Sequence, residues 1–273
     1  MKKIVLAGAC RTAIGTMGGA LSTVPAAELG SIVIKEALNR AGVPAEQVDH
    51  VYMGCVIQAG LGQNVARQAA LKAGLPVTTP AVTVNVVCGS GLNCVNMAAQ
   101  MIEAGDADIV VAGGTESMTQ VPMDPGTGWE NQYLLEHAPD NYISMGMTAE
   151  NVAADYHITR AEMEHMACES HAKAAAAQKA GYFDDQIIPI EVPGPDGKPV
   201  VLSRDDGIRE GTTPETLSKL KPCFKPDGVI TAAVSSQMTD GAGFVVLMSG
   251  EKARELGIQP IARFVGFAVD GVP

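Results

Sequence analysis

The stretch Val84-Asn85-Val86-Val87-Cys88-Gly89-Ser90-Gly91-Leu92 decides the fold of this chain and contains a candidate reactive group. A valine-rich apolar run leads into it and predicts a buried strand over residues 81–87. After the glycine-flanked turn, apolar residues recur at helical spacing as far as Ile102, which predicts a helix over 89–104. Cys88 is therefore expected where a buried strand turns into a helix.

A thiol at such a position has a specific chemistry. The first N–H groups of a helix lack internal partners and carry partial positive charge, so they stabilise a nearby thiolate, the reactive form of cysteine. Gly89 and Gly91 let a substrate carbonyl approach the backbone closely. We interpret Cys88 as an acyl-accepting nucleophile. The alternative is an inert core cysteine, because free cysteine is among the most often buried residue types.

Outward from Cys88, strand patterns alternate with helical ones. Alternating strands and helices predict an α/β fold in which a parallel sheet has helices on both faces. The remaining expected strands are 3–9, 51–57, 108–113 and 244–248, and the remaining expected helices are 26–41, one ending at Gly74, and 251–256. Two segments rich in proline and other turn residues, 119–147 and 189–230, are expected to form loops. Between them, Thr159 and Glu162 form a capping-box pattern for a helix that ends at Gly181.

Composition excludes several classes of protein. The chain has 273 residues, of which 47% are hydrophobic, so it can bury a large core. A net charge of −11 argues against nucleic acid as a partner. The sequence contains no run of 18 apolar residues, so no membrane span is expected. The six cysteines lack paired spacing and follow no signal peptide, so reduced thiols and a cytoplasmic location are expected.

Two competing motifs are weak. Gly60-x-Gly62-x-x-Val65 has the context of a dinucleotide site, but it lacks the third glycine, and no acidic residue occurs between Asp49 and Glu103 to bind a ribose. The histidines are spaced too widely for metal ligands, so we predict no metal site and place them, with Glu162, Glu164 and Glu169, on a solvated helix face; they are His157, His165 and His171.

The charge of the chain is uneven. Residues 198–226 carry six basic and four acidic side chains, whereas the rest of the chain is strongly acidic. This basic island is a candidate phosphate site. The alternative is an ordinary solvated loop.

Several motifs together resemble the thiolases, enzymes that make or cleave 3-ketoacyl-CoA. The segment from Asn85 to Asn93 resembles their nucleophile motif. The other motifs stand in the family order along the chain; they are Arg11-Thr12-x-x-Gly15, Gly60-Leu-Gly-Gln63-Asn64-x-x-Arg67-Gln68, Gly113-Gly114-x-Glu116-Ser117-Met118, Met145-Gly-Met-Thr-Ala-Glu150-Asn151-Val and Asp240-Gly241-Ala242.

The resemblance implies a thiolase-like layered α/β fold, in which a parallel-rich five-stranded sheet is covered by helices and interrupted by an inserted loop domain. Residues 1–118 and 241–258 would form the N-terminal α/β domain, and residues 119–240 the loop domain that binds coenzyme A. Residues 259–273 would form the first strand of a C-terminal domain that these 273 residues otherwise lack.

The resemblance also implies a function: reversible thiolytic cleavage or Claisen condensation of 3-ketoacyl-CoA in fatty acid metabolism, through an acyl-Cys88 intermediate. Coenzyme A and acyl-CoA would be substrates, with no permanently bound cofactor. A homo-oligomer, dimer or tetramer, is expected, with a dimer surface around residues 60–90. The positions carried over are Arg209, Leu220 and Phe224 for the nucleotide, and Met145 and Ser236 for the pantetheine arm.

The chain also departs from the family pattern. Thr231-Ala-Ala-Val234 replaces a frequent Thr-Ala-Gly-Asn, and neither Gly-His-Pro nor Cys-x-Gly occurs. Those two motifs supply the family's base and second cysteine, so the chain alone is predicted to be inactive. One alternative is a non-catalytic half that binds CoA or acyl-CoA, or that pairs with a separate C-terminal half as a split enzyme. The other, a 3-ketoacyl synthase-like enzyme, is disfavoured by Cys-Gly-Ser-Gly and the long loop domain.

Overall fold

The computed structural model describes residues 3–123, 128, 130–193 and 198–271. Contacts divide the chain into two compact units. The sheet unit comprises Met1–Pro122, Phe183–Asp206 and Thr239–Pro273, and the helical unit comprises Met123–Tyr182 and Gly207–Met238. The last two residues of the expected final strand lie outside the described part of the chain.

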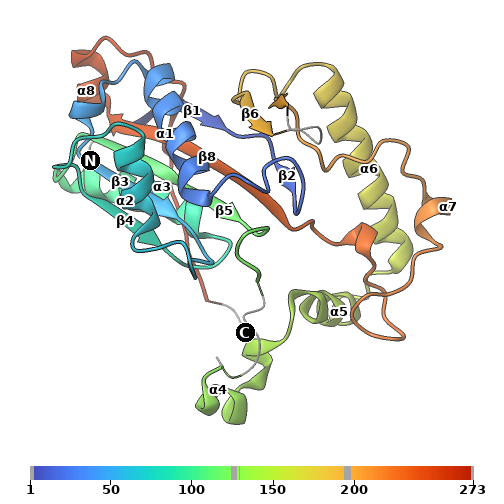
Figure 1. The fold of residues 1–273 in the computed structure, drawn as a ribbon. Coiled ribbons are helices and arrows are strands. Elements are labelled where there is room, and N and C mark those ends of the chain that lie inside the picture. Colours follow the sequence, from blue (N-terminus) through green and yellow to red (C-terminus); the bar gives the residue numbers. More distant parts are fainter. Residues whose placement is uncertain (1–2, 124–127, 129, 194–197, 272–273) are drawn as a thin grey trace. The chain divides into compact units, whose positions relative to one another are not determined.

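The sheet unit is built on one twisted sheet (Figure 1). Its strand order is β4-β3-β5-β8-β1-β9, and the short β2 pairs with β8. Five strands are long, and their number and the α/β class agree with the sequence prediction. The bounds are β1 Ile4–Arg11, β2 Gly15–Thr16, β3 His50–Gly54, β4 Ala81–Val84, β5 Ile109–Ser117, β8 Thr239–Ser249 and β9 Ala262–Arg263.

Strand directions show how the chain enters the sheet. β3 pairs in parallel with β4 and β5, whereas β8 is antiparallel to both β5 and β1. Four of the five long strands therefore point the same way, and β8 points the other way. The expectation of a parallel sheet holds for the strands joined by crossover helices. β8 returns from the long insertion instead, so no crossover fixes its direction.

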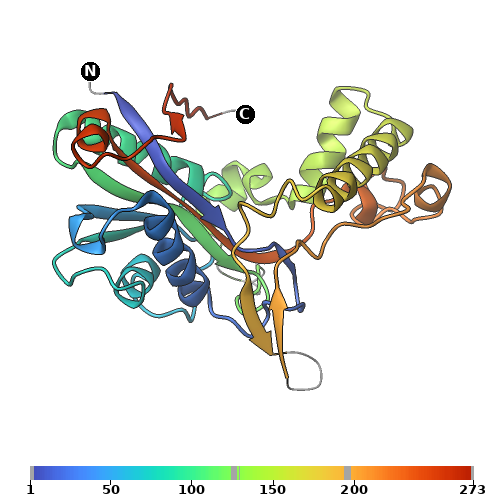
Figure 2. The ribbon, with the colours of Figure 1, turned by 90° about the horizontal axis from the view of Figure 1, so that it is seen from above.

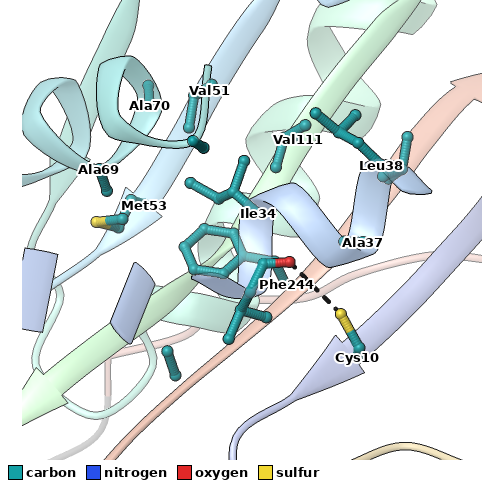
Figure 3. Packing of buried hydrophobic residues seen from close by; sticks show 14 of the residues in the cluster. Cys10, Ile34, Ala37, Leu38, Val51, Met53, Ala69, Ala70, Val111 and Phe244 are labelled. Carbon is teal, nitrogen blue, oxygen red and sulfur yellow. Dashed lines mark hydrogen bonds between the residues drawn. The ribbon is translucent and has the colours of Figure 1, made fainter. Parts of the chain in front are cut away.

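Helices cover both faces of the sheet. α1 (Ala26–Ala41) and α2 (Val65–Lys72) pack on one face, and α3 (Ser90–Ala104) packs on the other. On the first face, Ile34 and Ala37 of α1 lie against Val51, Val111 and Phe244 from three strands (Figure 3). β5 is buried on both sides, which explains its continuous apolar run from residue 109 to 112. A short 3-10 helix, η1 (Ala45–Gln47), precedes β3, and α8 (Gly250–Glu255) follows β8.

The helical unit contains α4 (Gln132–His137), η2 (Pro139–Tyr142), α5 (Met145–Asp155), α6 (Arg160–Lys179), α7 (Pro214–Leu217) and η3 (Ala232–Val234). The predicted capping box of α6 is present, because Thr159 and Glu162 bond reciprocally. Segments expected to be loops contain short helices. Each of α4, α5 and α7 begins at a side-chain cap, and these caps are Asn131, Ser144 and Thr213.

One element in the proline-rich segment was not expected. β6 (Ile190–Pro193) and β7 (Pro199–Leu202) form an antiparallel hairpin within the sheet unit (Figure 2). Ile190 and Val192 alternate with exposed residues and join the same apolar cluster as α1. The predicted domain limits stay a prediction, although segment 183–206 packs with the sheet. Within the described residues, no helix is long and apolar enough to cross a membrane.

Candidate active site

The chain turns sharply before Cys88. β4 ends at Val84 instead of residue 87, because Val87 has a φ of 55° that no regular strand accepts. A β-branched residue in this left-handed region costs about 1–2 kcal/mol. The thiol of Cys88 is exposed, and α3 begins at Ser90 with Gly89 as its N-cap. Cys88 is therefore not a core cysteine, and it directly precedes a helix N-terminus, as predicted.

Side chains on either side hold this turn. Ser90 Oγ accepts a hydrogen bond from the Val86 N–H at 2.9 Å and donates to the Val87 carbonyl. Asn85 Oδ1 accepts from the Val87 N–H at 2.9 Å. Gly54 of β3 lets the start of α3 lie close, because a Cβ at Gly54 would be 2.6 Å from the Gly91 nitrogen. The turn is thus fixed by polar contacts and by close backbone packing.

Three other thiols lie in the core and have a different chemistry. Cys10, Cys55 and Cys94 are buried, and burial raises the pKa of each thiol to about 12. The Cys10 thiol donates to the Val33 carbonyl at 3.5 Å (Figure 3). These cysteines stay protonated at neutral pH; of the others, Cys88 and Cys223 are exposed and Cys168 is partly exposed.

The sheet face next to the start of α3 is hollowed. A cavity of about 360 Å³ lies among the first turns of α3 and strands β1, β5 and β8. Gly91, Leu92 and Val95 of α3 line one side, and glycines 113, 114 and 243 open the strands beneath. Leu92 at this cavity is exposed, and so are Val86 and Val87, which directly precede Cys88 in the chain. An apolar group carried on Cys88 would find apolar surface close by.

The Arg11 motif serves the structure. The Arg11 guanidinium binds both Asp205 carboxylate oxygens at 2.7 and 3.0 Å, donates to Gln186 and lies over the Phe183 ring. Burial alone would raise the pKa of Asp205, but the hydrogen bonds from Arg11 and from the Ile14 N–H lower it below its usual value. Arg11 thereby ties segment 183–206 to β1.

The Asp240 motif also has a structural role. Asp240 is fully buried at the start of β8. It accepts hydrogen bonds from the Ser117 hydroxyl and from the Thr119 N–H, each at 3.0 Å. These contacts fix the end of β5 beside the start of β8.

In the helical unit, the five carried-over positions are exposed, and two of them are neighbours. Phe224 packs on Gly146, where an added Cβ would lie 2.2 Å from the ring. Because Gly146 follows Met145 at the start of α5, this contact brings Met145 and Phe224 to one place. Arg209, Leu220 and Ser236 are also open to solvent. Cys88 belongs to the other unit.

Leu220 is held by a charged clamp that the sequence did not reveal. Arg160 Nη2 donates to three carbonyls, those of Leu217 and Ser218 at 3.2 Å and that of Leu220 at 2.7 Å. Its Nε donates to Glu164 at 2.6 Å. The Glu164 side chain is only 7% exposed, so the expectation of a solvated face is wrong for this residue. Glu164 can be buried because the Arg160 guanidinium balances its charge. The same guanidinium is held in place by the three carbonyls.

Two further contacts brace the same unit. Glu150, buried in α5, accepts from the N–H groups of Val229 and Ile230 at 3.0 and 2.9 Å. His171 Nδ1 accepts from the Arg209 N–H at 3.2 Å, so the proton of the neutral ring lies on Nε2. His171 is thus a partner of the Arg209 backbone. The described residues contain no group of three or more His, Cys, Asp or Glu side chains able to hold a metal ion.

The basic island is divided between the two units. Asp205 and Asp206 bond to the sheet unit, where Asp206 Oδ1 accepts from the Thr16 N–H at 2.6 Å. In the helical unit, residues 207–226 keep four basic and two acidic side chains. Within the described part of the chain, none of the four basic side chains forms an ion pair; they are Arg209, Lys219, Lys221 and Lys225. These cations are available to an anionic ligand.

An exposed cysteine between a strand and a helix, on a helix-covered sheet, is suited to an enzyme that carries an acyl group on sulfur. Comparison with known proteins specifies the class. The family model "Thiolase, N-terminal domain" matches residues 4–251. The chain therefore belongs to the thiolase family, and it is an acyltransferase by family.

Individual relatives agree. An acetyl-CoA acetyltransferase of Cupriavidus necator is 49% identical, with 100% of this chain and 72% of the relative covered. A probable acetyl-CoA acyltransferase of Staphylococcus aureus is 44% identical with the same coverage. The crystal structure of the Bacillus anthracis acetyl-CoA acetyltransferase superposes with a TM-score of 0.91 at 42% identity, covering 100% of this chain and 72% of that chain.

Proposed function

We propose that Cys88 carries the acyl group in the thiolytic cleavage, and in the reverse Claisen condensation, of 3-ketoacyl-CoA. In thiolysis the Cys88 thiolate attacks the 3-keto carbon, the bond between C2 and C3 breaks, and C2 takes a proton as acetyl-CoA leaves. The thiol of a second CoA then attacks the Cys88 thioester and frees the sulfur. Dividing the transfer into two steps is the gain of covalent catalysis. The exposed thiol beside the start of α3 is the observation that carries this proposal.

The groups that move protons are proposed to come from outside these 273 residues. Cys88 needs a base, and the departing C2 needs an acid. Neither Gly-His-Pro nor Cys-x-Gly occurs in the sequence. The open cavity at the start of α3 is where a second half could place these groups. A separate C-terminal half, or a longer chain, would supply them.

Coenzyme A is proposed to bind on the helical unit. The unpaired cations of residues 207–226 suit its phosphates, because charge-assisted hydrogen bonds to phosphate are strong. Arg209, Leu220 and Phe224 would contact the nucleotide, and Met145 and Ser236 the pantetheine arm. The contact between Phe224 and Gly146 supports this assignment, since it brings Phe224 of the nucleotide set next to the neighbour of Met145 in the pantetheine set.

Oligomer formation is proposed at the β4 edge. β4 pairs only with β3 among the described strands, and Val82 is exposed on it. An open strand edge offers backbone groups to a second copy. The proposed dimer surface at residues 60–90 includes this strand. A cytoplasmic location and a place in fatty acid metabolism remain predictions.

The acyl intermediate can be tested directly. The chain is mixed with acetoacetyl-CoA and a thiolase C-terminal fragment, quenched in acid and digested, and the acetylated peptide is identified by mass spectrometry. Acetyl on Cys88, lost in Cys88→Ser and kept in Cys223→Ala, is the expected result. Acetylation of another cysteine would refute the proposal. So would the absence of any acetylated cysteine in a sample in which the fragment restores turnover. CoA binding without any acyl transfer would favour the non-catalytic half.

The CoA site has a separate test. Arg209→Ala should weaken CoA binding by about 1.5–3 kcal/mol through the loss of a charged hydrogen bond. Affinity should also fall with added salt, because each phosphate contact is screened. Isothermal calorimetry measures both, with Arg263→Ala in the sheet unit as the matched control. Unchanged binding in Arg209→Ala would remove Arg209 from the site.

A further inference from the structure

Glu116 lies near the end of β5 and contacts the segment that follows β3. Its Oε2 accepts from the Val56 N–H at 2.8 Å, and its Oε1 accepts from the Ile57 N–H at 3.2 Å. The Cys55 thiol, which burial keeps protonated, donates to Oε1 with a sulfur–oxygen distance of 3.7 Å. One carboxylate therefore orders three consecutive residues, although Glu116 lies far from Cys88 in sequence.

The ordered segment in turn orders Asn85. The Val56 carbonyl accepts from Asn85 Nδ2 at 3.1 Å, while Asn85 Oδ1 accepts from the Val87 N–H at 2.9 Å. Both ends of the Asn85 side-chain amide therefore form hydrogen bonds: the NH₂ group bonds to Val56 in the anchored segment, and the oxygen bonds to the backbone of Val87 in the turn. Asn85 is the side-chain link between the segment anchored by Glu116 and the Val87 turn. A backbone hydrogen bond from the Cys55 N–H to the Val84 carbonyl at 3.2 Å lies beside it.

The turn itself needs such support. Val87 holds a φ of 55°, and a strained residue persists only where its surroundings determine its conformation. Three backbone groups are fixed: the Val87 N–H by Asn85, and the Val86 N–H and Val87 carbonyl by Ser90 Oγ. Since Cys88 follows directly, these contacts set the direction in which its thiol leaves the chain.

We infer that Glu116 and Asn85 are positioning residues that hold the strained Val87 turn and keep Cys88 against the N-terminus of α3. The inference rests on the proposed role of Cys88 as nucleophile. Neither side chain need touch substrate. Loss of either one lets Val87 relax toward an ordinary backbone conformation, and the Cys88 thiol then loses its fixed direction beside the start of α3.

The test measures thiol reactivity within one molecule. Under limiting iodoacetamide, the ratio of the alkylation rates of Cys88 and Cys223 is read by peptide mass spectrometry, so Cys223 serves as the internal standard. We expect Asn85→Ala and Glu116→Gln to lower the ratio about fivefold to tenfold, the effect of one or two lost hydrogen bonds. Asn85→Asp keeps the acceptor for Val87 but loses the donor to Val56, so its ratio should be intermediate.

Matched controls separate positioning from general damage. Glu103→Gln, at an exposed carboxylate of α3, and Asn39→Ala, on α1, should leave the ratio unchanged. In every variant the buried Cys10 and Cys94 must remain unlabelled, which shows that the core is closed. If Cys10 or Cys94 becomes labelled in Glu116→Gln, the test is decided by the variants Asn85→Ala and Asn85→Asp.

An unchanged ratio in folded Asn85→Ala would overturn the inference. A wild-type ratio at or below one would instead overturn the role of Cys88, and with it this inference, so the two failures are distinguishable.

Discussion

At the scale of single residues, the environment of each cysteine decides what its thiol can do. Burial raises the pKa of Cys10, Cys55 and Cys94 to about 12, so at pH 8 roughly one in ten thousand of each is ionised. Cys88 is exposed at the start of a helix. Its accessibility, together with the helix N–H groups, makes it the expected site of fastest alkylation.

We therefore predict that brief iodoacetamide treatment at pH 8 labels Cys88 first, Cys223 and Cys168 more slowly, and the three buried cysteines last. Raising the pH from 7 to 9 should leave the buried thiols unlabelled in folded protein, because both burial and protonation protect them. Peptide mass spectrometry across a time course gives all six rates. Preferential labelling of Cys223 in folded protein would contradict the prediction.

Val87 offers a second residue-scale prediction. Val87→Gly relieves about 1–2 kcal/mol of left-handed strain but adds about 0.5–1 kcal/mol of unfolded-state entropy. The free energy of unfolding should therefore change by less than about 1.5 kcal/mol, while Cys88 alkylation slows. Urea unfolding and labelling rates are measured on the same sample. A large loss of stability would show that the valine side chain, and not its backbone angle, matters here.

The sequence placed Cys88 correctly between a strand and a helix, because apolar periodicity and glycine spacing report both elements. It did not predict that β4 ends at Val84. Valine favours strands, and the apolar run continues to Val87, so local preference favours a longer strand. The turn arises from the contacts of Ser90 with Val86 and Val87 and from Asn85, whose contact with the distant Val56 carries no local signal.

At the scale of elements, caps and ion pairs decide where the helical unit is firm. Arg160 donates hydrogen bonds to three backbone carbonyls around α7 and balances the negative charge of the buried Glu164. The sequence predicted α6 through its capping box, which is local. It could not predict the clamp, since 57 to 60 residues separate Arg160 from its carbonyl partners.

Arg160→Ala should destabilise the helical unit by about 2–4 kcal/mol, because it leaves a buried carboxylate without its partner. It should also weaken CoA binding by loosening the segment around Leu220. Lys173→Ala is the matched control: it breaks an exposed pair with Glu169 on the same helix and should change stability far less, because solvent screens that pair. Urea unfolding and calorimetry compare the two. Equal effects would show that the Arg160 clamp is not structural.

The pair formed by Arg11 and Asp205 joins segment 183–206 to β1, and it makes stability depend on pH. The folded-state pKa of Asp205 is lower than its usual value, so the unfolded chain binds a proton more readily. The pair contributes stability above about pH 4, the ordinary aspartate pKa. That contribution is lost as the pH falls through the folded-state pKa. Asp205→Asn should flatten this part of the acid unfolding curve, while Asp184→Asn, an exposed control, should not.

At the scale of the whole molecule, the order of strands and helices was predictable because each βαβ segment repeats the same local pattern. The reversed direction of β8 and the β6–β7 hairpin were not predictable from periodicity. β8 gains its place by pairing with β1 and β5 over long sequence separations. The hairpin lies in a segment whose prolines indicate loops, and only β6 alternates between buried and exposed residues, over four residues.

The segment after α8 gives the last prediction. Among the described residues after α8, strand pairing is limited to β9 and its two flanking residues: the Ile261 and Phe264 N–H groups donate to carbonyls of β1 at 2.9 and 3.0 Å. Beyond them, Val265 and Val269 are 84% and 68% exposed. An apolar segment without strand partners favours association with another chain. The 273-residue chain should therefore self-associate, and a complementing C-terminal half should bind it and restore thiolysis.

Light scattering over a concentration series, and an acetoacetyl-CoA thiolysis assay with and without the complementing fragment, test this prediction. Val265→Lys combined with Val269→Lys should shift the chain toward monomer, because charge opposes apolar contact. Met166→Lys, at an equally exposed site on α6, should not. A wild-type monomer at high concentration would refute the association. Full turnover by the chain alone would refute the stronger inference that the base for Cys88 lies outside these residues.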